Sequence, residues 1–307
     1  MDIFTTMITP FTQNGEVDYD TAQRYVDWYF ENGLTGIFAI CQSSEIFFLS
    51  LQERVELNRM VYRRAKELEK RCGRPFTVVS SGHVSESIEE QIRELCAVWE
   101  SGTDALILIT NRLAGQDESD DVWIENCQKI VAALPDDVKL GLYECPYPYK
   151  RLVTPKILDY CLSTGKFYYM KDTCCDAALI AQRVEQLKGS HFKLLNANCQ
   201  TLLESLKAGA DGYCGVMCNF HPRLYAWLLQ GFENEPEKAE ALQAFIGTFG
   251  FTEALAYPLT AKYHMGLCGM PTEVVARSKP NQELTDYAKS CMQQMKLASD
   301  LIEKALF

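Results

Sequence analysis

The amino-acid sequence predicts an α/β protein built as a (β/α)8 barrel, the TIM-barrel architecture, followed by a C-terminal extension of three helices. Short runs rich in β-branched and aromatic residues alternate with longer helical patterns as far as about residue 231, which is typical of parallel strands joined by helical crossovers. Eight such units in about 230 residues fit a closed barrel, whereas doubly wound sheets usually have fewer strands.

The expected strands cover residues 3–9, 35–40, 76–80, 105–110, 139–143, 167–171, 192–196 and 212–216. The helices between them carry apolar stripes, and the stripe of the first helix consists of Ala22, Tyr25, Val26, Tyr29 and Phe30. A glycine follows several helices where a left-handed residue is commonly needed, at Gly33, Gly102, Gly165 and Gly209. The same structural unit is therefore repeated along the chain.

Beyond Gly231 the strand pattern stops, and three helices are expected over residues 236–247, 252–265 and 286–306. No linker rich in Gly, Ser or Pro marks a separate domain. We therefore divide the chain into a catalytic barrel of residues 1–231 and a helical extension of residues 232–307.

The composition argues against nucleic-acid and membrane partners. The formal net charge is −11, and the densest basic stretch, Arg63 to Arg74, is diluted by Glu67 and Glu69, which indicates a solvated, ion-paired face. No segment approaches the roughly 18 apolar residues that a membrane span needs. Thirteen cysteines lie within strand and helix patterns, as expected for reduced thiols, so we expect a cytoplasmic protein.

Metal binding is not expected from the sequence. Cys214 and Cys218 are separated by three residues, the other cysteines are scattered, and the four histidines form no metal-ligand pair. The acidic run from Asp117 to Asp121 precedes an apolar-periodic segment, which favours a helix start over a calcium loop.

Two side chains at the ends of neighbouring strands could carry chemistry, because barrel enzymes place their reactive groups there. The sixth strand ends in Lys171, and burial among apolar residues would favour the neutral amine that attacks a ketone. The fifth strand ends in Tyr143, which could act as a general acid and base. The structural alternatives are a lysine that reaches solvent or pairs with Asp172, and an ordinary packing tyrosine.

Two further segments could bind a substrate. The turn Cys41-Gln42-Ser43-Ser44-Glu45 offers the hydroxyls of Ser43 and Ser44 and backbone N–H groups to a carboxylate, although the same residues are equally suited to helix capping. In the eighth strand, Gly215 would allow a ligand to approach the backbone closely, and we include Cys214 beside it.

The order and spacing of these segments resemble the dihydrodipicolinate synthase and N-acetylneuraminate lyase family over nearly the whole chain. The opening from Thr6 to Phe11 with Gly15 to Asp18, the segment Leu49-Ser50-Leu51-Gln52-Glu53-Arg54 and the stretch from Ala208 to Gly212 are similar to family segments. The resemblance implies that Lys171 is the Schiff-base lysine, that Tyr143 is the catalytic tyrosine, and that Ser43 and Ser44 lie in a carboxylate-binding turn. It also implies a homotetramer or homodimer and no cofactor or metal.

The sequence departs from the family at several positions. The turn usually reads Gly-Thr-Thr-Gly-Glu or Gly-Ser-Thr-Gly-Glu, so both glycines and the first hydroxyl are replaced here. The synthases carry a tyrosine where this chain has residues 111–113 and an arginine where it has residues 147–150, which argues against lysine biosynthesis. Residues 196–200 lack the acidic side chains of the sialic acid lyases.

The sequence therefore predicts a Schiff-base lyase or aldolase that acts on pyruvate or another 2-oxo acid. A 2-oxo acid dehydratase or decarboxylating dehydratase that uses the same imine is the first alternative. A barrel that binds a metabolite without turnover is the second.

Overall fold

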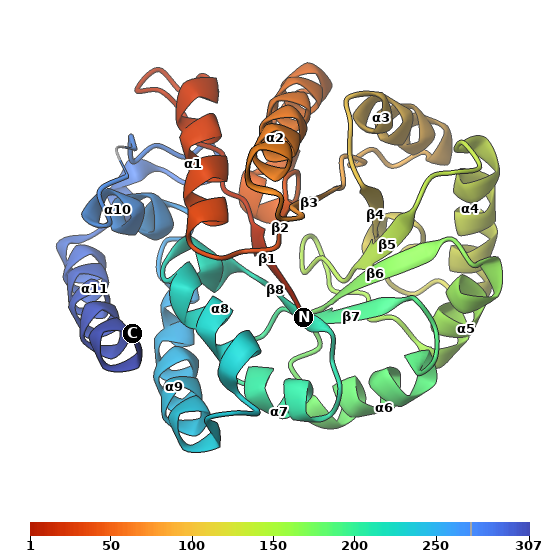
Figure 1. The fold of residues 1–307 in the computed structure, drawn as a ribbon. Helices are drawn as coiled ribbons and strands as arrows, with labels where there is room; N and C mark the ends of the chain where they lie inside the picture. The colour runs from red at the N-terminus through yellow and green to blue at the C-terminus, as the bar shows by residue number, and fades with distance from the viewer. Residues whose placement is uncertain (271) are drawn as a thin grey trace.

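Eight parallel strands close into a barrel in the order in which they occur along the chain, and β1 pairs with both β2 and β8 (Figure 1). This computed structural model describes residues 1–270 and 272–307. The strands are β1 Asp2–Thr6, β2 Gly36–Phe38, β3 Thr77–Ser80, β4 Ala105–Ile109, β5 Leu140–Tyr143, β6 Phe167–Asp172, β7 Lys193–Asn196 and β8 Gly212–Gly215. The predicted barrel and its eight strands are confirmed, with strand ends within three residues of those expected.

Eight helices alternate with the strands and surround the barrel (Figure 1). They are α1 Tyr19–Glu31, α2 Leu51–Cys72, α3 Ile88–Glu100, α4 Asp120–Ala133, α5 Pro155–Thr164, α6 Ala177–Leu187, α7 Leu202–Lys207 and α8 Pro222–Gly231. The predicted apolar stripe of α1 is buried in full. The predicted left-handed glycines are also confirmed, with φ of +66° at Gly165 and +102° at Gly209.

The third helix buries polar side chains that its apolar pattern did not reveal. Gln91 and Glu94 lie on its buried face. The Gln91 side chain lies 2.8 Å from His83 Nδ1, and Glu94 accepts a 3.1 Å hydrogen bond from Arg54 Nη2. These specific partners make burial of the two polar groups tolerable.

The charged surface features follow the sequence. Arg63 forms a 3.8 Å ion pair with Glu67, so the basic stretch of α2 is ion-paired as predicted. The acidic run ends in the first turn of α4, where Asp120 and Asp121 follow the N-cap residue Ser119, which confirms the predicted helix start. Within the described residues, no helix combines the length and apolar character needed to cross a bilayer.

The C-terminal extension consists of α9 Pro236–Phe249, α10 Leu259–Leu267 and α11 Asp286–Leu306. The single helix expected over residues 252–265 was wrong, because a 3-10 turn over Gly250–Ala254 precedes a break before α10. Pro258 lies at the break, and a proline inside a helix removes a backbone donor and clashes with the preceding turn.

Buried residues of α9 and α11, including Leu242, Ile246 and Met292, belong to the same hydrophobic cluster as the barrel residues Phe4 and Phe38. The extension therefore shares a core with the barrel. Because α8 ends at Gly231, the division at residues 231 and 232 falls between secondary-structure elements, and it remains a proposal.

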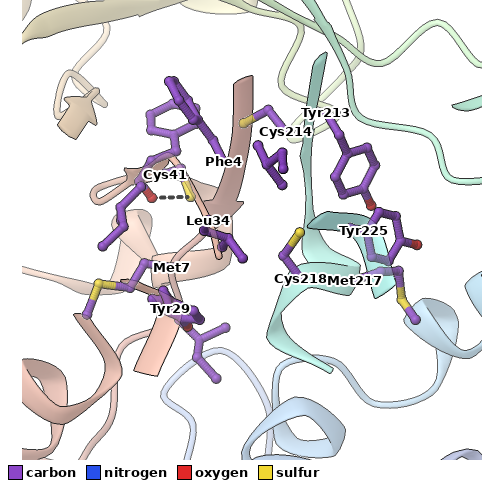
Figure 2. Packing of buried hydrophobic residues seen from close by; sticks show 14 of the residues in the cluster. Phe4, Met7, Tyr29, Leu34, Cys41, Tyr213, Cys214, Met217, Cys218 and Tyr225 are labelled. Carbon is purple, nitrogen blue, oxygen red and sulfur yellow. Dashed lines mark hydrogen bonds between the residues drawn. The ribbon is translucent and has the colours of Figure 1, made fainter. Parts of the chain in front are cut away.

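Strand alternation separates the barrel interior from the layer beneath the helices. Figure 2 shows Tyr213 and Cys214 leaving β8 in opposite directions. Tyr213 stacks on Tyr225 of α8 with ring centroids 4.4 Å apart, whereas Cys214 lies beside Phe4, its register partner on β1. Side chains in register with Cys214 therefore face the packed interior of the barrel, and those nearest the carboxyl ends of the strands border the face where barrel enzymes place their active sites.

Candidate active site

Lys171 and Tyr143 meet at the carboxyl ends of adjacent strands. They are register partners on β6 and β5, and the Lys171 Nζ atom lies 4.2 Å from the centre of the Tyr143 ring. Lys171 is only 7% exposed, so its side chain does not extend into solvent. The carboxylate of Asp172 binds Arg183, so the structure also disfavours the alternative in which Lys171 pairs with Asp172.

Aromatic and thiol side chains surround this pair. The Phe38 ring packs edge-on against the Tyr143 ring with centroids 5.5 Å apart, and Lys171 Nζ lies 5.9 Å from the Phe38 centroid. Burial raises the pKa of the Tyr143 phenol well above its ordinary value of 10. Burial also raises the pKa of the Cys214 thiol to about 12, although the nearby Lys171 side chain opposes this shift. Tyr143 therefore remains a neutral proton donor at physiological pH.

Gln42 contacts Tyr143, and the sequence analysis did not predict this contact. Its Oε1 atom accepts a 3.4 Å hydrogen bond from the Tyr143 hydroxyl and a 3.3 Å hydrogen bond from the Cys145 thiol. The signal that could have indicated this contact is the position of Gln42 in the turn after the second strand. The family that the sequence resembles carries a hydroxyl side chain there. An amide oxygen preserves the acceptor but cannot pass on a proton as a hydroxyl can.

The structure distinguishes the two serines of the turn. Ser43 donates a 3.0 Å hydrogen bond to Thr6 Oγ1 at the end of β1, so it lies on the barrel side of the turn. Ser44 Oγ lies 2.7 Å from the carbonyl oxygens of both Met7 and Ala39 and accepts from Cys41 N. The Ser44 hydroxyl is thus committed to the backbone, and the geometry supports its capping role rather than the predicted contact with a carboxylate.

The two predicted substrate-binding residues of β8, Cys214 and Gly215, also differ in their surroundings. Cys214 lies on the interior face near Lys171, as a substrate contact would require. At Gly215, an added Cβ would lie 2.1 Å from the Tyr213 hydroxyl and 2.8 Å from the Ala197 carbonyl oxygen. Close packing within the chain therefore accounts for this glycine, and the expected approach of a ligand is not needed to explain it.

The C-terminal extension anchors the turn through buried Glu45 and Lys262 and partly exposed Arg277, which together we call the turn cluster. Glu45 Oε1 lies 3.3 Å from Lys262 Nζ, and Oε2 accepts a 2.7 Å hydrogen bond from the Arg277 backbone N–H. Burial lowers the pKa of Lys262 to about 8, although Glu45 opposes the shift. Glu45 itself has φ of +59°, which is uncommon for a residue other than glycine. The turn is therefore held by residues more than 200 positions away.

Residues 1–298 match the profile of the dihydrodipicolinate synthetase family. The chain belongs to this family. Within it, a 4-hydroxy-tetrahydrodipicolinate synthase of Alkalilimnicola ehrlichii is 26% identical over 306 residues, which cover 96% of this chain and 97% of that protein.

Two solved structures of the dihydrodipicolinate synthetase type have the same fold. YagE, a prophage protein of E. coli K12 described in complex with pyruvate, has a TM-score of 0.84 and 20% identity over 98% of both chains. A structure described as the first monomeric dihydrodipicolinate synthase variant has a TM-score of 0.85 and 18% identity over 98% of this chain and 97% of that chain.

One segment that resembles the dihydrodipicolinate synthetase family has a plain structural role here. Ser50 and Glu53 form a reciprocal capping box at the start of α2. Glu53 also binds Arg277, with Oε1 2.6 Å from Arg277 Nη2. This segment therefore joins α2 to the residues that hold the turn.

Proposed function

We propose that this chain is a Schiff-base lyase or aldolase that acts on pyruvate or another 2-oxo acid through Lys171. The observation that carries the proposal is the buried Lys171 amine, 4.2 Å from the ring centre of the Tyr143 phenol at the mouth of the barrel. Membership of the dihydrodipicolinate synthetase family supports this assignment, as does the pyruvate complex described for YagE.

In the proposed reaction, the neutral Lys171 amine adds to the C2 carbonyl carbon of the 2-oxo acid and forms a carbinolamine. Tyr143 donates a proton to the departing hydroxyl, which leaves as water and yields the iminium ion. The iminium draws electrons from C3, so either the C3–H bond or the C3–C4 bond breaks to give an enamine. The Tyr143 phenolate accepts the proton released from C3, or from the C4 hydroxyl when C3–C4 is cleaved, and becomes a phenol again. Addition of the enamine to an aldehyde, or the reverse cleavage, followed by hydrolysis returns the free amine.

Ser43 is the proposed hydroxyl donor to the substrate carboxylate, because its side chain lies on the barrel side of the turn beside Thr6. Lys150 is proposed to face the distal part of the substrate. Its Nζ atom donates a 2.6 Å hydrogen bond to the Thr173 carbonyl oxygen, which follows β6 directly. A cation at this place favours a substrate whose distal portion carries an anionic or hydroxyl group.

The test is reductive trapping of the imine. The protein is incubated with pyruvate and borohydride, digested, and examined by mass spectrometry for an N-(1-carboxyethyl) group on Lys171. The wild type and a Lys166→Ala control, altered directly before the amino end of β6, should both carry the adduct. Lys171→Ala should carry none, and labelling that survives this substitution would exclude the mechanism.

The two alternatives give different products. A dehydratase or decarboxylating dehydratase would form the same adduct on Lys171. Its turnover would release water, accompanied by carbon dioxide in the decarboxylating case, and would not cleave the substrate into pyruvate and an aldehyde. A non-catalytic binding barrel would bind a 2-oxo acid and form no adduct, even with longer 2-oxo acids.

We further propose that the protein is cytoplasmic and forms a homotetramer or homodimer. All thirteen cysteines are free thiols, as is usual in a reducing compartment. Light scattering coupled to size exclusion should give a mass of two or four chains, and a mass of one chain would contradict the assembly.

A further inference from the structure

Beneath the two proposed catalytic side chains lie three charged residues, Glu144, Asp172 and Arg183, which we call the strand-end cluster. Glu144 follows Tyr143, and Asp172 follows Lys171, so each catalytic residue has an acidic neighbour along the chain. Because successive side chains of a strand point to opposite faces, Tyr143 and Lys171 face the interior while the two carboxylates face the helices. Both carboxylate side chains are fully buried.

Arg183 of α6 joins the two carboxylates with one guanidinium group. Its Nη2 atom lies 2.7 Å from Glu144 Oε1, and its Nη1 atom binds Asp172 Oδ2. Nη2 also donates a 2.7 Å hydrogen bond to the Val153 carbonyl oxygen. The Arg183 side chain is 3% exposed. The planar group therefore holds the ends of β5 and β6 at one fixed geometry.

Backbone N–H groups balance the second negative charge of the cluster. Val153 N donates a 2.7 Å hydrogen bond to Glu144 Oε1, and Thr173 N donates a 2.9 Å hydrogen bond to Glu144 Oε2. Cys174 N donates a 2.8 Å hydrogen bond to the Asp172 carboxylate. The loops that follow both strands are thus fastened to the same three side chains.

The backbone alone aligns the strand ends loosely at this point. The hydrogen bond from Glu144 N to the Lys171 carbonyl oxygen is long, at 3.4 Å. A buried ion cluster also adds little net stability compared with apolar packing of the same volume, because three charges must be desolvated. What the charges supply is direction, since one guanidinium group holds both carboxylates, although its buried Nε atom has no hydrogen-bond partner within the described residues.

We propose that Arg183 is a positioning residue that sets the separation between the Lys171 amine and the Tyr143 phenol by clamping Glu144 and Asp172. This inference rests on the proposed function. Proton transfer between the imine and the phenol requires hydrogen-bond distances, and a misplacement of about 1 Å can slow an enzymatic reaction by ~10²-fold. Loss of the clamp should therefore affect the rate of the reaction rather than the binding of the substrate.

The primary test is Arg183→Lys, which keeps the positive charge but loses the two-pronged geometry. Rapid mixing with pyruvate, quenched by borohydride at successive times, measures the maximal rate of adduct formation on Lys171 and the pyruvate concentration for half-saturation. The maximal rate should fall by roughly 10- to 100-fold, while the half-saturating concentration changes by less than about 3-fold.

Arg64→Lys is the matched control. Arg64 also binds carboxylates, with its Nε atom 2.6 Å from Asp27 and its Nη1 atom 3.1 Å from Glu67, but it lies on α2 outside the barrel. Its maximal rate should equal that of the wild type. Equal slowing in both variants would indicate a general loss of structure and would overturn the positioning role.

Arg183→Met combined with Glu144→Gln and Asp172→Asn removes all three charges and provides a second variant should Arg183→Lys fail to fold. A folded triple variant should also show the reduced rate, because neutral side chains cannot form the clamp. Wild-type rates in either folded Arg183 variant would refute the inference while leaving the proposed function intact. The absence of any Lys171 adduct in the wild type would instead refute the proposed function, and the inference with it.

Discussion

The strand-end cluster and the turn cluster hold two halves of one candidate site, but they draw on different parts of the chain. The strand-end cluster joins residues within 40 positions of one another, and the turn cluster joins Glu45 to residues near the C-terminus. In both, burial disfavours charge, since it raises the pKa of Glu144, with help from Asp172, and lowers that of Lys262 to about 8.

The two regions also differ in how far they follow the family. At the ends of β5 and β6, Tyr143 and Lys171 are the residue types that the family resemblance assigns to these positions. The turn, in contrast, lacks both glycines of the family pattern and carries Gln42 at the position of the first hydroxyl. The turn is held from outside by contacts between Glu45 and the C-terminal extension. The Lys171–Tyr143 pair thus depends on strand register and on the nearby strand-end cluster, whereas the turn depends on residues more than 200 positions away.

The largest effect should come from removing that support. A chain of residues 1–231 lacks Lys262 and Arg277 and leaves Glu45 buried without its ion-pair partner. It also loses the apolar contacts of α9 and α11. We expect no cooperative thermal transition by circular dichroism, in contrast to the full chain. Cooperative folding of residues 1–231 would show that the barrel is independent of the extension.

A single substitution in the turn cluster should be less damaging. Lys262→Met leaves the Glu45 carboxylate buried and unpaired, so the free energy of unfolding should fall by about 3–5 kcal/mol in urea titrations. The double variant Lys262→Met with Glu45→Gln should recover part of this loss, because no unpaired charge remains. If the single and double variants are equally stable, the ion pair is not what holds the turn.

On the other side of the site, Tyr143→Phe should slow adduct formation by ~10²-fold. Stability should be nearly unchanged, since the hydrogen bond from the Tyr143 hydroxyl to Gln42 is long, at 3.4 Å. Tyr213→Phe is the matched control, because its ring stacks on Tyr225 outside the barrel interior. The rate of adduct formation on Lys171 is measured for both variants by trapping with borohydride at successive times. A similar slowing in the two variants would assign the effect to packing.

The stability of the turn cluster should also depend on pH. The pKa of Lys262 in the folded protein, about 8, lies below its ordinary value of 10.5, so the unfolded chain binds this proton more tightly. The free-energy cost of burying the charged Lys262 amine is present in full below about pH 8. It is relieved as the pH rises toward 10.5, so the free energy of unfolding should increase over that range. Urea unfolding of the wild type minus that of the Lys262→Met, Glu45→Gln double variant isolates this contribution, and a flat difference would contradict it.

The smallest effect is expected at Gln42. Gln42→Leu removes the acceptor of the Tyr143 hydroxyl and the Cys145 thiol, which should slow adduct formation by about 5-fold. Gln42→Thr keeps an acceptor and should remain within about 2-fold of the wild type. If the Gln42→Leu and Gln42→Thr variants form the adduct at the same rate, the contact between Gln42 and Tyr143 has no role in the reaction.

The sequence by itself determined the barrel, its eight strands and the placement of Lys171 and Tyr143 at adjacent strand ends. These features follow from local periodicity and from the rule that parallel strands present their carboxyl ends at one mouth. The break before α10 was missed because the helical pattern was extended through Pro258.

Only the tertiary structure decided how the site is held together. It placed Gln42 against Tyr143, committed the Ser44 hydroxyl to the backbone, and brought Lys262 and Arg183 onto their buried carboxylates. These contacts join residues that no short-range pattern relates. They form because a closed barrel buries the polar groups at its strand ends, and each such group must then find a partner wherever the fold provides one.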